Sequence, residues 1–229
     1  MISRRAFIEA AGAAILLAGC SSQQQEPEPA EQPAEPETAP VAEPEPEPEP
    51  EPESEPTTAG SPSGMLVLYF SRADENYNAG VIDEGNPAII AKMIASRTGA
   101  DLFELETVRA YDPAYMTCIE EAKAELRENA RPELKAMPAN LDAYDTIFLG
   151  YPNWWGTCPM CVFTFVENAD LAGKRIIPFC TNEGSGLGKS ERDLAKAAPG
   201  ATIERGLSVL GHDSERAQAK TAAWARQFA

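Results

Sequence analysis

Two adjacent tryptophans, Trp154 and Trp155, are the residues of this chain whose type and placement most strongly suggest a binding site. They stand in the loop Tyr151–Thr157, directly after the apolar run Thr146–Gly150. A tryptophan ring favours burial, whereas its N–H group needs a hydrogen-bond partner, so two such rings beyond a strand are unusual. They predict either a stacking wall for a flat ligand or a plug at the end of a sheet.

Two polar segments follow other apolar runs and add groups that could bind the rest of such a ligand. Ser71–Tyr77 follows the first run, and Gly85–Pro87 then opens a helical segment, so a hydroxyl and free helix N–H groups could hold a phosphate. Thr181–Gly188 follows a later run and combines glycines with Thr, Asn and Ser side chains. Glycines there let backbone N–H groups approach a flat ligand closely.

The elements that must position these loops alternate between two kinds. Continuous apolar runs of this length are typical of strands buried on both faces of a parallel sheet, and the segments between them have helical spacing. This order predicts an α/β domain with a doubly wound sheet, whose ligands bind beyond the carboxyl ends of the strands. The predicted strands are Met65–Phe70, Leu102–Glu106, Thr146–Gly150, Arg175–Cys180 and Thr202–Val209. The predicted helices are Ala88–Arg97, Ala114–Asn129, Pro159–Asn168, Lys189–Ala197 and Ser214–Phe228.

From Met65 to Gly211 the chain resembles the flavodoxin-like family. The resemblance is carried by Tyr69–Arg72, Gly150–Gly156 and Gly173–Gly186, which occur in the family's order. It implies a five-stranded parallel sheet in the order 2-1-3-4-5 and an FMN cofactor. The residues that it implies for FMN binding are Ser71, Arg72, Asn76, Asn86, Pro87, Pro152, Asn153, Trp154, Trp155, Gly156, Thr181, Asn182, Gly184, Ser185 and Gly186.

The chain departs from the family pattern at three positions. Pro87 stands where relatives carry Thr, and proline lacks both the hydroxyl and the N–H group. Asp74 stands where Gly is expected, and Asn182 where His is expected. Each lost charge-assisted hydrogen bond lowers affinity by roughly ten- to a hundredfold, so the departures put FMN retention in question.

Cys158 and Cys161 form a Cys-x-x-Cys pair at the start of a predicted helix. A helix N-terminus lowers the pKa of a thiol, which favours a redox pair that exchanges electrons with a nearby flavin. A static disulfide and two small buried side chains are the alternatives.

Charge and composition exclude several function classes. Residues 65–229 hold 23 acidic and 17 basic residues, which gives no electrostatic footprint for nucleic acid. The single histidine, His212, excludes multi-histidine metal sites and leaves little material for Ser-His-Asp hydrolysis. Three functions therefore remain open: electron transfer to a redox partner protein or small-molecule acceptor, reduction of quinones or small electrophiles by an FMN-dependent enzyme, and a flavin-less surface binding module.

The N-terminal segments predict export and anchoring. Residues 1–20 combine Arg4 and Arg5, an apolar stretch and the segment Leu17–Cys20, which resemble a twin-arginine signal followed by a lipobox. Cys20 would then carry the lipid that holds the protein at the extracytoplasmic face of the cell membrane. Residues 21–63, rich in Pro and Glu, predict an extended tether, and residues 64–229 the folded domain.

Overall fold

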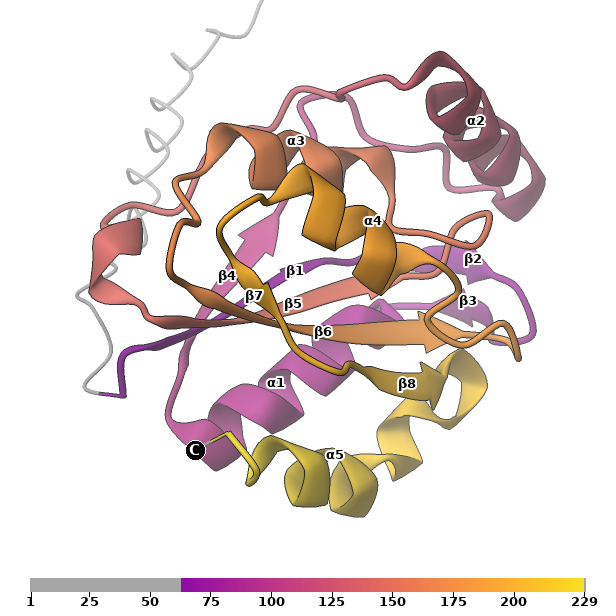
Figure 1. Ribbon diagram of the computed structural model, residues 1–229. Coiled ribbons are helices and arrows are strands. Elements are labelled where there is room, and N and C mark those ends of the chain that lie inside the picture. The colour runs from indigo at the N-terminus through magenta and orange to yellow at the C-terminus, as the bar shows by residue number, and fades with distance from the viewer. Residues whose placement is uncertain (1–62, 229) are drawn as a thin grey trace, which may run out of the picture. The chain divides into compact units, whose positions relative to one another are not determined.

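The computed structural model describes residues 63–228, which form a central parallel sheet with helices on both faces (Figure 1). The sheet runs in the order β4-β1-β5-β6, and both β7 and β8 pair with β6 beyond it. All pairings within this sheet are parallel, which confirms the predicted doubly wound order 2-1-3-4-5. The strands are β1 Met65–Phe70, β4 Asp101–Leu105, β5 Thr146–Pro152, β6 Arg175–Asn182, β7 Thr202–Ile203 and β8 Leu207–Leu210.

Helices cover the two faces of the sheet in separate layers. In Figure 1, α3 and α4 lie on one face and α1 and α5 on the other. The α-helices are α1 Asn86–Thr98, α2 Tyr115–Glu128, α3 Met160–Asn168, α4 Ser190–Ala197 and α5 Gln218–Ala225, and the 3-10 helices are η1 Leu141–Ala143 and η2 Gly211–Arg216. The single helix predicted over Ser214–Phe228 was therefore wrong, because η2 and α5 are separate elements.

Alternate side chains of the strands supply two hydrophobic cores, one on each face. Leu66 and Leu68 of β1 belong to the core under α3 and α4, whereas Val67 and Tyr69 belong to the core under α1 and α5. Leu66, Val67 and Leu68 are fully buried, as the continuous apolar run predicted for a strand covered on both faces.

The last strand of the sheet is interrupted, where the sequence predicted one strand over Thr202–Val209. β7 pairs with β6 at Arg175 and Ile176, and β8 resumes the pairing at Phe179. The gap lies beside Pro178, which has no N–H group to donate to a sheet ladder. Gly206 lies in this gap. A larger residue would clash there, because a Cβ on Gly206 would lie 2.7 Å from the Pro178 carbonyl oxygen.

A short antiparallel hairpin follows β1 before α1 begins. It consists of β2 Asp74–Asn76 and β3 Gly80–Ile82. Its turn contains Asn78 at φ 58°, in the left-handed region that asparagine tolerates. The hairpin lies with α2 at the carboxyl edge of the sheet (Figure 1).

Residues 1–62 fall outside the described part of the chain, so the predicted signal segment, the tether and lipidation of Cys20 have no structural counterpart here. Within residues 63–228, no helix is both long enough and apolar enough to cross a membrane.

Gly150 of β5 has a packing role that a substitution can test. A Cβ at this position would lie 2.1 Å from Cζ of the buried Phe179 ring on β6. We expect Gly150→Ala to lower the free energy of unfolding by about 1–3 kcal/mol because the ring must move within a filled core. Urea denaturation measures this change.

The double variant Gly150→Ala/Phe179→Leu provides the control, because the smaller side chain makes room for the added methyl group. A double-mutant cycle should show that Gly150→Ala is less destabilising in the Phe179→Leu background. Equal destabilisation in both backgrounds would contradict the predicted clash.

Candidate functional site

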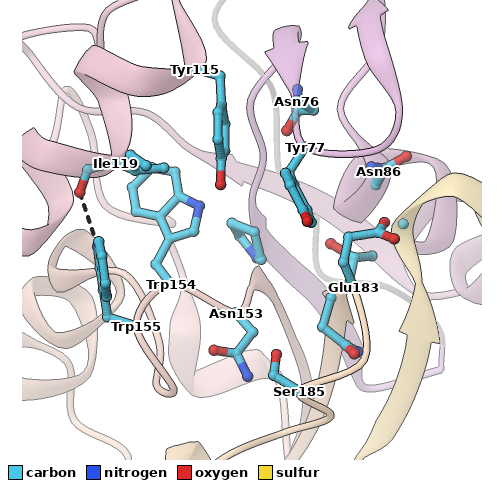
Figure 2. A pocket seen from close by; sticks show the side chains of 14 residues that line it. Asn76, Tyr77, Asn86, Tyr115, Ile119, Asn153, Trp154, Trp155, Glu183 and Ser185 are labelled. Carbon is cyan, nitrogen blue, oxygen red and sulfur yellow. Dashed lines mark hydrogen bonds between the residues drawn. The ribbon is translucent and has the colours of Figure 1, made fainter.

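A cavity of ≈ 270 Å³ opens at the carboxyl edge of the sheet, among the loops that follow β1, β5 and β6 (Figure 2). This edge includes the point where the chain connections from β1 and β5 diverge, which is where doubly wound sheets bind ligands. The lining residues are Asn76, Tyr77, Asn86, Tyr115, Ile119, Pro152, Asn153, Trp154, Trp155, Thr181, Asn182, Glu183, Ser185 and Gly211.

The structure brings most of the predicted site residues together at this cavity. The exceptions are Ser71, Arg72, Pro87, Gly156, Gly184 and Gly186, which do not line it. That any of the predicted residues binds a cofactor remains a prediction. Sequence reasoning missed five residues that do line the cavity: Tyr77, Tyr115, Ile119, Glu183 and Gly211.

Two of the missed residues come from α2, which is not one of the three strand-end loops. Tyr115 and Ile119 are four residues apart, so they lie on the same face of the helix. The sequence shows this spacing. It does not show which part of the protein this face of α2 covers, because that depends on the long connection between β4 and α2.

Trp154 forms an aromatic wall of the cavity. Its ring centre lies 5.5 Å from that of Phe70 and 4.9 Å from that of Tyr111, both in edge-to-face geometry. Such contacts fix the orientation of the indole from its core side. Trp154 therefore packs on the core and also lines the cavity. Its role as a stacking wall for a flat ligand stays a prediction.

Trp155 is held in an unusual backbone conformation. Its φ is 55°, in the left-handed region that bulky residues rarely adopt, and its side chain is 45% exposed. The indole Nε1 donates a hydrogen bond of 2.9 Å to the Ile119 carbonyl of α2, and Lys123 Nζ lies 5.0 Å from the ring centre. Outliers of this kind cluster at binding sites, where surrounding contacts hold them in place.

Asn153 locks the tryptophan loop to the glycine-rich loop. Its Nδ2 donates to the Gly186 carbonyl at 2.7 Å, and its Oδ1 accepts from the Gly156 N–H group at 2.9 Å. Its backbone N–H group donates to the Thr181 carbonyl at 2.8 Å. The two loops therefore form one bonded unit across the carboxyl edge of β5 and β6.

Asn182 holds the glycine-rich loop in turn. Its Oδ1 accepts hydrogen bonds from the N–H groups of Gly184 and Gly186, both at 2.9 Å. Its Nδ2 donates to Ser208 Oγ at 2.8 Å and to the Val209 carbonyl at 3.1 Å. The amide thus uses both of its ends to join this loop to β8, which accounts for an asparagine where the family pattern predicts His.

The loop after β1 is stabilised mainly by its own side chains. Arg72 donates to the carbonyls of Glu75 at 2.7 Å, Asp112 at 3.0 Å and Pro113 at 2.7 Å. Asp74 has a φ of 65°, which explains why a glycine is expected there.

The side chains of Asn76 and Ser71 also bind protein groups. Asn76 Nδ2 lies within hydrogen-bond distance of the carbonyls of Arg72, Ala73 and Asp74, at 3.1–3.4 Å. Ser71 Oγ accepts a hydrogen bond from the N–H group of Ala88 in the first turn of α1.

A pair of stacked tyrosines joins the hairpin to α2 beside the cavity. The rings of Tyr77 and Tyr115 lie 5.7 Å apart at an angle of 26°, and Figure 2 shows both side chains extending toward the cavity. Glu75 Oε2 also accepts the Tyr115 N–H group at 2.9 Å. Burial and then the neighbouring Tyr77 raise the pKa of Tyr115, so its phenol stays neutral.

Glu183 lines the side of the cavity opposite the tryptophans and is bonded to His212. His212 Nδ1 lies 2.6 Å from Glu183 Oε2, and the His212 N–H group donates to Oε1 at 3.0 Å. Asn78 of the hairpin turn also donates to Oε2 at 3.4 Å. The hydrogen bond to the Glu183 carboxylate raises the pKa of His212 above its usual value.

The cysteine pair lies in the core. Cys158 and Cys161 are buried free thiols, and neither lines the cavity. The expectation of lowered thiol pKa values is wrong, because burial raises the pKa of both thiols. Of the readings considered for this pair, two small buried side chains match the structure.

The donors and acceptors at the cavity suit a flat heteroaromatic ligand. Trp154 and Ser185 lie on different sides of the cavity (Figure 2), and Thr181 adds another polar side chain to its lining. Gly211 keeps the cavity open where Asn86 and Glu183 converge, because a Cβ there would lie 2.8 Å from Asn86 Nδ2 and Glu183 Oε1.

Comparison with known proteins gives the context of this site. The profile of the flavodoxin family matches residues 65–227. Candidate flavoproteins from Bacteroides eggerthii and Bacteroides uniformis are similar in structure, with 28% and 27% identity and TM-scores of 0.59 and 0.58. Both alignments cover 71% of this chain, and they cover 96% and 97% of the Bacteroides proteins.

A flavoprotein from Lactobacillus acidophilus, solved in complex with FMN, shares the fold at 19% identity and a TM-score of 0.52. The alignment covers 66% of this chain and 95% of that protein. Comparison with curated proteins gave no match.

From the Glu183–His212 contact we predict a raised pKa for the only histidine in the chain. An NMR pH titration should give a His212 midpoint above 6.5, because the carboxylate stabilises the protonated imidazole. A raised folded-state pKa means that the pair stabilises the fold fully below the unfolded-state pKa of about 6.5 and loses this effect as pH rises through the folded-state pKa.

Two variants locate the cause of this shift. Glu183→Gln should return the midpoint to about 6.5, whereas Asp213→Asn should change it less, because Asp213 lies farther away, at 3.6 Å from His212 Nε2. A wild-type midpoint at or below 6.5, or one that Glu183→Gln does not change, would contradict the assignment.

Proposed function

Because this chain belongs to the flavodoxin family, we propose that its cavity binds FMN and that the protein transfers electrons. The single observation that carries this proposal is a cavity at the switch point of the sheet, walled by Trp154 and bounded by the two interlocked loops. When bound, FMN supplies one- and two-electron redox chemistry. The side chains bind the ring, orient it and exclude water from one face.

The residues at the cavity fit the ring of this cofactor. Trp154 is held by its contacts with Phe70 and Tyr111 and offers an indole face for stacking. The glycine-rich loop is held by Asn153 and Asn182, so its backbone N–H and carbonyl groups are positioned before a ligand arrives. Preorganisation of this kind lowers the entropic cost of binding.

The ionisable groups at the cavity support electron transfer over side-chain catalysis. Glu183 is the only carboxylate among the lining residues, and it is already bonded to His212. The phenol of Tyr115 stays neutral because burial raises its pKa. General acid–base chemistry needs a group whose pKa lies near the working pH and whose proton can reach the substrate.

The size of the cavity favours a carrier over a reductase. Its volume of ≈ 270 Å³ lies below the range of about 300–1,000 Å³ that ligand pockets usually enclose. A flavin ring would fill this space, which leaves no enclosed volume for a quinone or another electrophile above it. Electrons would then pass to a redox partner protein through the exposed side of the site, where Trp155 and Tyr77 are accessible.

In the same proposal, the protein works outside the cytoplasm. The twin-arginine motif at Arg4 and Arg5 supports export, and the segment Leu17–Cys20 supports lipidation of Cys20. The segment 21–63 then spaces the flavin domain from the membrane, which lets it meet partners beyond the lipid surface.

FMN binding is tested by quenching of flavin fluorescence with the purified chain. We expect saturable quenching at micromolar FMN and a yellow protein. Trp154→Leu should weaken binding about tenfold or more, because stacking on an aromatic ring contributes roughly 1–3 kcal/mol per base. Trp224→Leu is the matched control, since Trp224 contacts Phe148 and Phe228 and does not line the cavity.

Melting temperatures of both variants separate a lost ligand contact from a general loss of stability. Chain that stays colourless and does not quench micromolar FMN would overturn the redox proposal and favour a flavin-less binding module. If FMN binds, rapid reduction by NAD(P)H alone would favour the reductase over the carrier.

The anchoring proposal is tested by fractionation of cells that express the full chain. Cys20→Ala should abolish labelling with a radioactive or clickable fatty acid and move the protein out of the membrane fraction. Cys118→Ala, which changes a buried thiol of α2, is the control and should leave the distribution unchanged. Membrane association that survives Cys20→Ala would contradict a lipid anchor at this residue.

A further inference from the structure

We propose that this site recognises a flavin through its ring and gains little from the 5′-phosphate, so that riboflavin and FMN bind with affinities within about tenfold of each other. This inference rests on the proposed flavin binding. It concerns the chemical class of the ligand: flavins with or without the terminal phosphate.

The side chains expected to bind the phosphate are largely occupied by the protein itself. The guanidinium of Arg72 is bonded to three backbone carbonyls of the loop and of the connection before α2. The Asn76 amide is directed at carbonyls of its own loop. The Ser71 hydroxyl accepts the Ala88 N–H group. A phosphate that recruited Arg72 or Asn76 would have to break bonds that hold the loop after β1 in place.

The N-terminus of α1 offers fewer N–H groups than a typical anion-binding helix start. Pro87 lies in the first turn and has no N–H group. The N–H group of Ala88 is shared between Ser71 Oγ at 3.2 Å and the Gly85 carbonyl at 3.0 Å, and that of Ile89 also bonds to Gly85. The helix start therefore retains little of the free donor capacity on which phosphate sites depend.

Carboxylates surround this helix start on the side of Ser71 and Arg72. A depression of ≈ 310 Å³ is lined there by Asp83, Glu84 and Glu104 together with these two residues. The one lysine in its lining, Lys92, is paired with Glu84 at 2.6 Å. Arg72 Nε is buried without a partner among the described residues, but an anion that reached it would have to approach these carboxylates.

The other side of the helix start is also acidic. A depression of ≈ 640 Å³ shares Asn86 and Gly211 with the ring cavity, and Asp83, Glu84 and Glu215 line it. His212 is the only side chain in this lining that can carry a positive charge, and it is bonded to Glu183. A phosphate dianion thus meets acidic side chains on either route from the ring cavity, and like charges oppose its binding.

The ring side of the site has one carboxylate in its lining, that of Glu183. Trp154 is held by edge-to-face contacts with Phe70 and Tyr111 and also lines the ring cavity. Asn153 and Asn182 hold the loops around it. A neutral ring also avoids repulsion by Glu183. Binding free energy should therefore come mainly from the part of the ligand that FMN and riboflavin share.

The test measures the dissociation constants of FMN and riboflavin for the same purified chain by fluorescence quenching, at low and high salt. We expect a ratio below tenfold. A phosphate held by two charge-assisted hydrogen bonds would instead favour FMN by roughly a hundredfold or more at low salt. A preference for FMN above tenfold overturns this inference but leaves flavin binding intact. Failure of both ligands to bind overturns the proposed function as well.

A pair of double variants tests the electrostatic cause. Asp83→Asn/Glu84→Gln should tighten FMN binding about three- to tenfold and leave riboflavin binding unchanged, since only FMN carries the phosphate. The control Asp142→Asn/Asp170→Asn also removes two negative charges, but near the amino ends of β5 and β6, at the opposite edge of the sheet. It should change neither affinity. If the first double variant leaves the FMN affinity unchanged, the carboxylates do not limit phosphate binding and the inference is wrong.

Discussion

The Asn153 side chain is the contact on which the rest of the site depends. Parallel strands bring the loops after β5 and β6 to one edge of the sheet, but they do not hold those loops to each other. The Asn153 amide does so, by bonding to Gly186 of one loop and Gly156 of the other. Asn182 extends this connection to β8. The cavity is therefore bounded by hydrogen bonds that exist without a ligand.

This connection explains how Trp155 can occupy a left-handed conformation. Gly156 follows it at φ 83° and is bonded to Asn153, while the indole N–H group of Trp155 is bonded to α2. Contacts on both sides thus offset a conformational cost of about 1–3 kcal/mol. The resulting turn leaves Trp154 facing the core and Trp155 facing α2, so neighbouring residues serve different walls of one site.

How much the sequence could predict depends on whether local chemistry decides each feature. The continuous apolar runs of β1 and β5 predicted their strands because burial on both faces admits few polar residues. The break in the last strand depends on Pro178 of a neighbouring strand, and the contribution of Tyr115 depends on where α2 packs. The pKa of Cys158 was predicted in the wrong direction because the thiol is buried, and burial disfavours the charged thiolate.

The loop after β1 shows why family likeness alone does not define the ligand. Ser71 and Asn76 match the family's pattern, yet their polar groups bind the protein chain. The central claim, that the preformed cavity binds a flavin ring, is tested most directly by the indole N–H signals of the three tryptophans during an FMN titration by NMR. The account predicts that the signals of Trp154 and Trp155 shift while that of Trp224 does not. Signals of Trp154 and Trp155 that stay unchanged at saturating FMN would contradict it.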